Sequence, residues 1–106
     1  MPTQPLPVIP GPTAITPPNY FNIAASVTSI LLVPASSDRL MVLIFNDSTA
    51  YLNIKFGMSA TSANFNVQLR PHGYYEFSLP IYLDNVYGVW TAATGFAKVT
   101  EFIQGV

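Results

Sequence analysis

Few side chains in this sequence have the chemistry of a catalyst. His72 is the only histidine, and an imidazole acts as a general base when a nucleophile or an orienting carboxylate lies beside it. It stands between Pro71 and Gly73 in a predicted turn, with neither of those groups next to it in the sequence. We therefore expect His72 to be an exposed turn residue, and we assign no catalytic residue.

The acidic residues are too widely spaced to predict a metal or acid–base site. They are Asp38, Asp47, Glu76, Asp84 and Glu101. No calcium-loop spacing or carboxylate pair occurs among them, and the chain has no cysteine for a thiolate, a disulfide or a zinc site. We predict no enzyme activity, no metal and no cofactor. The polar pairs at 46–47 and 84–85 are better explained as turns, where short side chains bond their own backbone.

Aromatic residues offer another kind of chemistry, the stacking of sugars on exposed rings. The candidates are Tyr74, Tyr75, Tyr82, Tyr87 and Trp90, so a carbohydrate-binding module is one alternative function. We favour the interpretation in which Tyr75, Phe77 and Trp90 fill the core, while outward tyrosines supply contact area at a subunit interface. Residues 57–63 are small and lack a lysine for a phosphate, which indicates a loop that makes lateral contacts.

The elements that must position these residues are β-strands. Apolar alternation or short apolar runs, bounded by turn residues, occur at residues 23–27, 30–33, 39–45, 51–56, 65–69, 74–79, 86–90 and 97–102. The run at 39–45 is nearly continuous and predicts a strand buried on both faces. Seven or eight strands with no helical period indicate an all-β fold, an antiparallel β-sandwich of jelly-roll type.

Two turns are expected to join neighbouring strands into hairpins. Residues 70–73 carry proline at the second position and glycine at the fourth, as a β-turn favours, and they separate the strands predicted at 65–69 and 74–79. Gly95 can take the positive φ of a bulged loop between the last two strands.

The first 18 residues differ from the rest, because seven of them are proline. Proline fixes φ and has no N–H, which excludes a helix or an interior strand and predicts an extended arm. No charged residue occurs before Asp38. Such an arm gains order by laying apolar surface on another protein chain. The residues expected to bind are Leu6, Val8, Ile9, Ile15 and Tyr20, the last as a pivot where arm 1–18 meets domain 19–106.

Composition narrows the choice of partners. Charged residues are 8% of the chain, against about 25% in ordinary domains, so much of the surface is uncharged and suited to an assembly. A net charge of −1 with four basic residues argues against nucleic acid and anionic lipid as partners. No apolar run is long enough to span a bilayer. The start also lacks the basic region of a signal peptide, so we expect synthesis in the cytoplasm.

Several short segments resemble a known group of proteins. They are the sequences at 44–48 (IFNDS), 52–57 (LNIKFG), 73–76 (GYYE), 88–90 (GVW), 93–95 (ATG) and 97–101 (AKVTE). Together, over Arg39 to Glu101, they resemble small structural proteins of tailed bacteriophages. The resemblance implies a virion protein, and some similar jelly-roll proteins act as capsid cement or decoration subunits.

The resemblance and the arm together predict a capsid cement protein. We expect the sandwich to sit on the outer surface of the head as a homotrimer, with arm 1–18 bound to the major capsid protein, after synthesis in the host cytoplasm. The alternatives are a tail, fibre or head-fibre adaptor component of the virion, and a carbohydrate-binding β-sandwich module.

Overall fold

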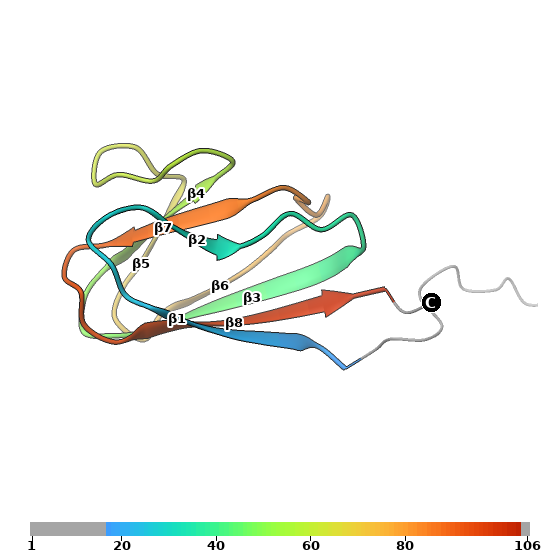
Figure 1. Cartoon of the computed structure of the whole chain (residues 1–106), viewed down its shortest axis with the longest axis horizontal. Coiled ribbons are helices and arrows are strands. Elements are labelled where there is room, and N and C mark those ends of the chain that lie inside the picture. Colours follow the sequence, from blue (N-terminus) through green and yellow to red (C-terminus); the bar gives the residue numbers. More distant parts are fainter. Residues whose placement is uncertain (1–16, 105–106) are drawn as a thin grey trace, which may run out of the picture.

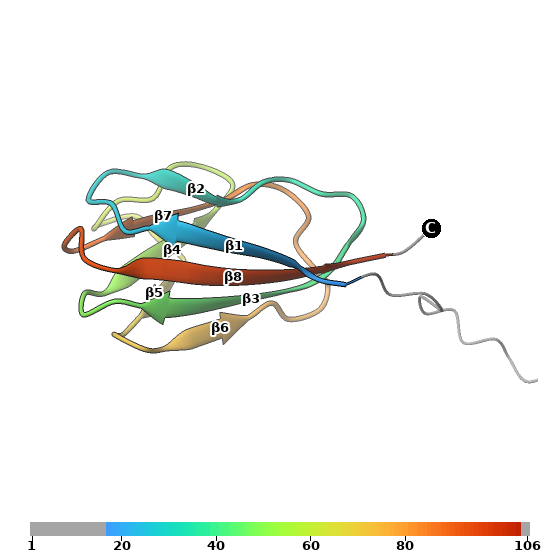
Figure 2. The same ribbon diagram turned by 60° about the horizontal axis from the view of Figure 1, so that its bottom comes forward.

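The protein is an all-β sandwich of two antiparallel sheets. The computed structural model describes residues 17–104. Its strands are β1 (Asn19–Ala24), β2 (Ile30–Val33), β3 (Arg39–Asp47), β4 (Leu52–Phe56), β5 (Val67–Leu69), β6 (Tyr74–Glu76), β7 (Val86–Trp90) and β8 (Phe96–Ile103). One sheet has the order β1-β8-β3-β6 and the other β2-β7-β4-β5, and Figures 1 and 2 show the two layers. The predicted all-β sandwich is confirmed.

The core lies between the two sheets because alternate side chains of each strand point inward. Its most deeply buried members are Leu32, Val33, Val42, Ile44, Leu52, Ile54, Val86, Trp90, Ala97 and Val99. On β4 the predicted inward residues Leu52 and Ile54 are fully buried, and Phe56 packs against the core. Phe77 and Trp90 are buried, as predicted, whereas Tyr75 is half-buried at the margin of the core.

Three predictions about single strands are wrong. The first strand lies at Asn19–Ala24 and not at 23–27, and Val27 is 58% exposed. β3 is buried on one face only: Val42 and Ile44 are fully buried, while Leu43 and Phe45 on the other face are half-buried. No described element of the chain covers that outer face. The apolar alternation predicted through Leu79 also fails, because β6 ends at Glu76 and Leu79 is 83% exposed.

The turn at residues 70–73 is confirmed, but it does not close a hairpin. The Gly73 N–H donates to the Arg70 carbonyl at 2.9 Å, and His72 has a φ of 65°. β5 pairs with β4, however, while β6 pairs with β3 in the other sheet. The turn therefore carries the chain from one sheet to the other across the end of the sandwich.

The loop between β7 and β8 likewise crosses between sheets. β7 is paired on both sides, with β2 and β4, and β8 is paired on both sides, with β1 and β3. Since neither strand has a free edge for the other, the hairpin predicted here is wrong. Gly95 does have the predicted positive φ, 87°. A Cβ at this position would strike the Asp47 carbonyl and the Ser48 side chain.

Candidate functional site

Of the five predicted binding residues, only Tyr20 lies in the described part of the chain. Leu6, Val8, Ile9 and Ile15 fall outside the described residues. Tyr20 is the second residue of β1, pairs with Thr100 of β8 and is 74% exposed. A depression of about 410 Å³ lies beside it, lined also by Asn22, Lys98 and Thr100. The expected pivot is therefore an open aromatic side chain on the sheet that contains β3.

The side chains around Tyr20 form one surface, which we call the outer face. It consists of the residues of β1, β8, β3 and β6 that point away from the core. The register places Tyr20, Thr100, Leu43 and Glu76 in one row across the strands, and Asn22, Lys98, Phe45 and Tyr74 in the next. Phe96 extends the surface beside Ala24. Aromatic and neutral side chains thus predominate on an uncovered sheet.

Charge on the outer face is sparse. Lys98 Nζ lies 3.8 Å from Asp47 Oδ2, and both side chains are well exposed to water. An exposed pair at this distance contributes little to stability. Glu76 is the other charged residue in the two rows. Large exposed rings with few charges are the composition typical of the centre of a protein–protein interface.

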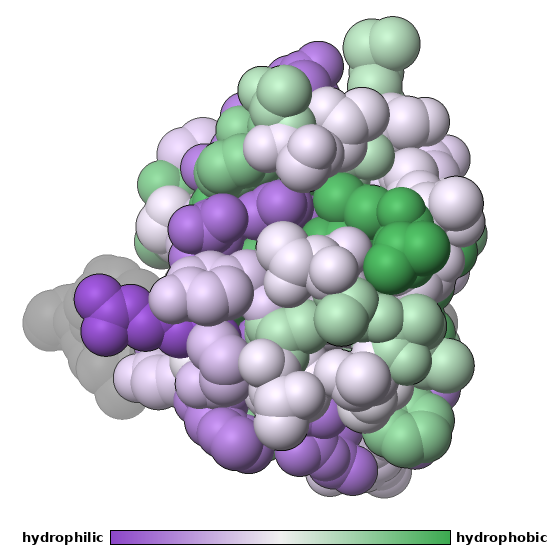
Figure 3. All heavy atoms as spheres, turned by 90° about the vertical axis from the view of Figure 1, so that its left-hand side faces the viewer, coloured by the Kyte–Doolittle hydropathy of each residue, from purple (hydrophilic) through white to green (hydrophobic). Residues whose placement is uncertain are grey.

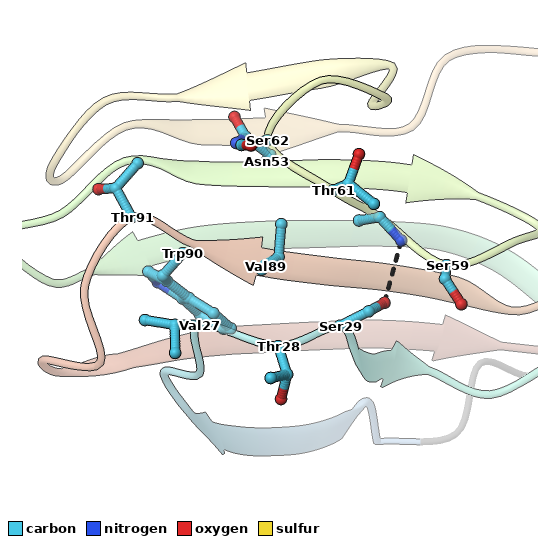
Figure 4. Close-up of a pocket in the computed structure, with 11 residues that line it drawn as sticks. Val27, Thr28, Ser29, Asn53, Ser59, Thr61, Ser62, Val89, Trp90 and Thr91 are labelled. Carbon is cyan, nitrogen blue, oxygen red and sulfur yellow. Dashed lines mark hydrogen bonds between the residues drawn. The ribbon is translucent and has the colours of Figure 1, made fainter.

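The other sheet carries a shallow groove of about 620 Å³, whose lining residues are drawn in Figure 4. Its walls come from the loop at residues 59–62 and from the segment before β2. The Ala60 N–H donates to Ser29 Oγ at 3.0 Å and holds that loop over the sheet. Hydroxyl and small apolar side chains line most of the groove, together with Asn53 and Trp90, and no carboxylate or basic group is among them. The predicted loop at 57–63 therefore folds back on its own domain at Ala60, which is buried.

The loops at one end of the sandwich are uncharged for the most part and bound to one another. Thr49 and Thr94 join their hydroxyls at 3.1 Å, and the Tyr51 N–H donates to Thr91 Oγ1 at 3.1 Å. Figure 3 looks at this end: much of it has intermediate hydropathy, with several hydrophilic areas and one strongly hydrophobic area to the side. These contacts connect the β3–β4 loop to the β7–β8 loop, so hydrogen bonds to threonine hydroxyl groups hold this end together.

Beneath those loops, Asn46 is buried and binds groups from both sheets. Its Nδ2 donates to the carbonyls of Ala50, Leu69 and Arg70 at 2.8, 3.3 and 3.0 Å. Its Oδ1 accepts from Ser48 Oγ at 2.8 Å and from Trp90 Nε1 at 3.1 Å. The prediction of a turn at 46–47 is therefore wrong, because β3 continues through Asp47 and the amide of Asn46 serves the core.

Arg39 has the corresponding role at the opposite end. Its Nε donates to Glu101 Oε2 at 2.9 Å, and both side chains are buried. The remaining guanidinium nitrogens donate to three carbonyls, those of Pro34, Tyr82 and Asp84, at 2.6, 2.6 and 3.2 Å. Every one of these groups comes from a different segment than β3. Sequence reasoning missed this pair, since 62 residues separate its members.

The prediction that His72 is an exposed turn residue is confirmed. Its ring lies 6.2 Å from that of Phe45. Asp84 Oδ1 accepts from the Asn85 N–H at 2.7 Å, which fits the turn predicted at 84–85. Within residues 17–104 no three His, Cys, Asp or Glu side chains gather in a way that could hold a metal ion.

The aromatic candidates for sugar binding do not share a face. Trp90 is buried, Tyr74 points outward from β6, and Tyr87 lies on β7 of the other sheet. Tyr75 and Tyr82 instead contact Phe56, with ring centroids 6.2 and 5.1 Å apart. Burial, followed by the nearby Asp84 carboxylate, raises the pKa of the Tyr82 phenol above its ordinary value of 10.0.

Comparison with known proteins adds no relative. Residues 17–104 contain no helix long and apolar enough to cross a bilayer. No family model, characterised protein or solved structure matches this chain. The outer face and the chain that leads into it are therefore the features that bear on function.

Proposed function

We propose that this chain is a structural protein of a tailed bacteriophage virion, acting as a capsid cement or decoration protein. The observation that carries the proposal is the outer face, an aromatic sheet surface with few charges that includes β1, the strand into which residues 1–18 lead. A sandwich held by buried polar contacts at both ends is a rigid platform for such a surface. In this role the protein binds through contact area and needs no reacting group.

The strand pairing supports a jelly-roll assignment for the sandwich. β1 pairs with β8, β2 with β7, β3 with β6 and β4 with β5. These four pairs are those of one long antiparallel ribbon wound into two sheets, which is how a jelly roll is built. Jelly rolls are common in viral capsid proteins and also in lectins, so the fold is compatible with the cement role and with the carbohydrate alternative.

Binding is proposed to begin with arm 1–18, which engages the major capsid protein on the head surface. A polyproline-like chain advances about 3.1 Å per residue, so 18 residues reach roughly 55 Å, enough to cross onto a neighbouring subunit. A protein that binds only the assembled shell stabilises that state by mass action. The sequence predicts a homotrimer, which would carry several arms. Once the first arm has bound, the effective concentration of the remaining arms near their binding sites is high.

The first test is the place of the chain in the particle. Virions of the phage that encodes it are purified, its copy number is measured by mass spectrometry, and its position is found by electron cryo-microscopy. We expect many copies on the outside of the head. Density in the tail or in a fibre supports the adaptor alternative, and absence from the virion overturns the proposal.

A second test separates the arm from the domain. Protein comprising residues 19–106 retains all eight described strands, so we expect it to fold and to lose binding to heads that the full chain decorates. Binding by the shortened protein at the occupancy of the full chain would show that the arm is not the anchor. For the carbohydrate alternative, binding of the isolated protein to a glycan array is the direct measurement, and we expect none.

A further inference from the structure

Of the free edges among the described strands, that of β1 in the first sheet is unusual. β1 pairs with β8 on one side, and no described strand pairs with its other side. The strand has six residues in unbroken register and carries no charge, proline or glycine. The other edge strands, β2, β5 and β6, have four, three and three residues. Proteins normally shorten, charge or bulge a free edge to prevent pairing, and β1 uses none of these devices.

The register shows which backbone groups of β1 face the open side. The Ala25 N–H donates to the Gly95 carbonyl at 2.9 Å, in line with the ladder that pairs Ile23 with Ala97. Hydrogen-bonded pairs alternate along an antiparallel ladder, so the odd-numbered residues of β1 bond to β8. The N–H and C=O groups of Tyr20, Asn22 and Ala24 therefore point away from β8, toward the open edge.

We propose that β1 pairs with β1 of a second copy of this chain, antiparallel about a two-fold axis at Asn22. Residues that face each other across a ladder must point to the same side of the sheet. Pairing of the even-numbered residues meets this condition and also uses their open backbone groups. In the resulting register Asn22 lies opposite Asn22 of the second copy, and Tyr20 lies opposite Ala24.

The side chains favour this register over a pairing with an unrelated strand. Tyr20 is large and 74% exposed, and the register sets it beside the small side chain of Ala24. The next residue in that row is Phe96, which pairs with Ala24 and is 41% exposed. Tyr20 of each copy thus lies over Ala24 and against Phe96 of the other. Two exposed aromatic rings in each copy are covered by the same symmetric contact.

The end of the ladder is also set by the sequence. Beyond Asn19 comes Pro18, an even-numbered position whose N–H would have to face the second copy. Proline lacks that donor, so the pairing stops there. No charged side chain lies on either strand, and identical strands meet without repulsion.

The contact area indicates a weak dimer. A fully covered aromatic side chain buries about 150–250 Å². Covering the exposed fractions of Tyr20 and Phe96 in both copies therefore buries on the order of 500 Å² of aromatic surface. Stable complexes bury about 1,200–2,000 Å². We expect a dissociation constant on the order of 0.1–1 mM. The two-fold symmetry predicts dimers in place of the homotrimer expected from the sequence, and the inference does not depend on the capsid role.

Cysteine cross-linking tests the register directly, because the chain has no cysteine of its own. In the dimer the two Asn22 Cα atoms lie about 5.5 Å apart, within the range that a disulfide spans. Full-length Asn22→Cys, treated at about 1 mM protein with glutathione disulfide as the oxidant, should give mostly disulfide-linked dimer. Glu76→Cys, exposed on the opposite edge strand, is the matched control and should stay mostly monomeric. Equal cross-linking of the two variants would overturn the proposal.

Charge substitution at the two-fold axis gives an independent test. Asn22→Lys places two ammonium groups opposite each other, and Asn22→Asp places two carboxylates there. Each variant alone should be monomeric by sedimentation equilibrium at about 1 mM, where about half or more of the unchanged protein is dimeric at the expected dissociation constant. An equimolar mixture should regain the dimer. A monomeric unchanged protein at that concentration, a trimer, or a mixture no more associated than its components would each overturn the pairing.

Discussion

Arg39 and Asn46 stand near the two ends of β3 and bind opposite ends of the sandwich. Arg39 joins β8 to the segments that follow β2 and β6, and Asn46 joins the loops after β3 and β5 to Trp90. Buried polar groups are stable only when they are hydrogen-bonded. Each of these side chains therefore fixes several segments at once.

The amide of Asn46 is expected to be the most sensitive polar group in the protein. Asn46→Ala leaves Trp90 Nε1 and several carbonyls without their present partner, and an unsatisfied buried group costs about 1–3 kcal/mol. We expect the free energy of unfolding to fall by about 3 kcal/mol or more in urea titrations. A loss below about 1 kcal/mol would mean that water replaces the amide.

Asn46→Asp tests the donor role at nearly constant shape. A carboxyl buried among carbonyl oxygens has a raised folded-state pKa, since burial disfavours its charged form. Stability is then retained below the unfolded-state pKa and is lost as the pH rises through the folded-state pKa. Relative to the unchanged protein, the variant should lose more stability at pH 7 than at pH 4. Equal losses at the two pH values would contradict the assignment.

The two ion pairs of the described chain should differ sharply in energy. Glu101→Gln leaves the guanidinium of Arg39 buried without a counter-charge, and breaking such a pair costs about 3–5 kcal/mol. Lys98→Gln removes an exposed partner of Asp47 and should cost less than about 1 kcal/mol. Chemical denaturation of both variants measures the contrast. Similar losses would show that burial does not set the strength of the Arg39–Glu101 pair.

At the scale of elements, the close packing of β7 depends on a residue without a side chain. Gly88 lies between β2 and β4 in the second sheet, paired with Ile30 and Ile54. A Cβ there would come 2.6 Å from Leu32 Cδ1 and 3.0 Å from Leu52 Cδ1. Both leucines are fully buried, so neither can turn aside into solvent.

Gly88→Ala is therefore expected to destabilise the protein by overpacking, by about 1–3 kcal/mol. Leu32→Ala alone opens a cavity and should cost about 2–5 kcal/mol. The double variant fills part of that cavity, so its loss should be smaller than the sum of the two single losses. Thermal or urea unfolding of the three variants measures this coupling, and strict additivity would argue that the two sites are not in contact.

At the scale of the whole molecule, the sheets should unfold together. The chain crosses from sheet to sheet after every strand but β4, and Arg39 and Asn46 bind segments of both. Neither sheet can then lose its structure while the other remains. This arrangement also gives the outer face a rigid support.

Cooperative unfolding can be followed with two probes. Trp90 is the only tryptophan and is buried, so its fluorescence reports the core, while far-ultraviolet circular dichroism reports the strands. We expect the two urea transitions to coincide, as in a two-state domain. Separate midpoints would show that one sheet, or the end near Asn46, opens first.

Local pattern was enough to find the strands, though not all of their bounds, because inward and outward side chains alternate along a strand whatever it pairs with. The number of strands, the inward residues of β4, the turn at 70–73 and the positive φ of Gly95 all follow from short stretches of sequence. Tyr20 was selected from its position after the prolines, and its exposure on β1 fits that choice.

Tertiary structure decided everything that joins distant segments. Whether two neighbouring strands form a hairpin depends on which edges are already occupied, and this is why β5–β6 and β7–β8 cross between sheets. Asn46, Arg39 and Glu101 are buried and hydrogen-bonded by partners up to 62 residues away in the sequence. Without those partners, a polar residue at the end of a strand has the sequence pattern of a turn. The outer face is likewise a product of pairing, since only the register of four separate strands brings its rings together.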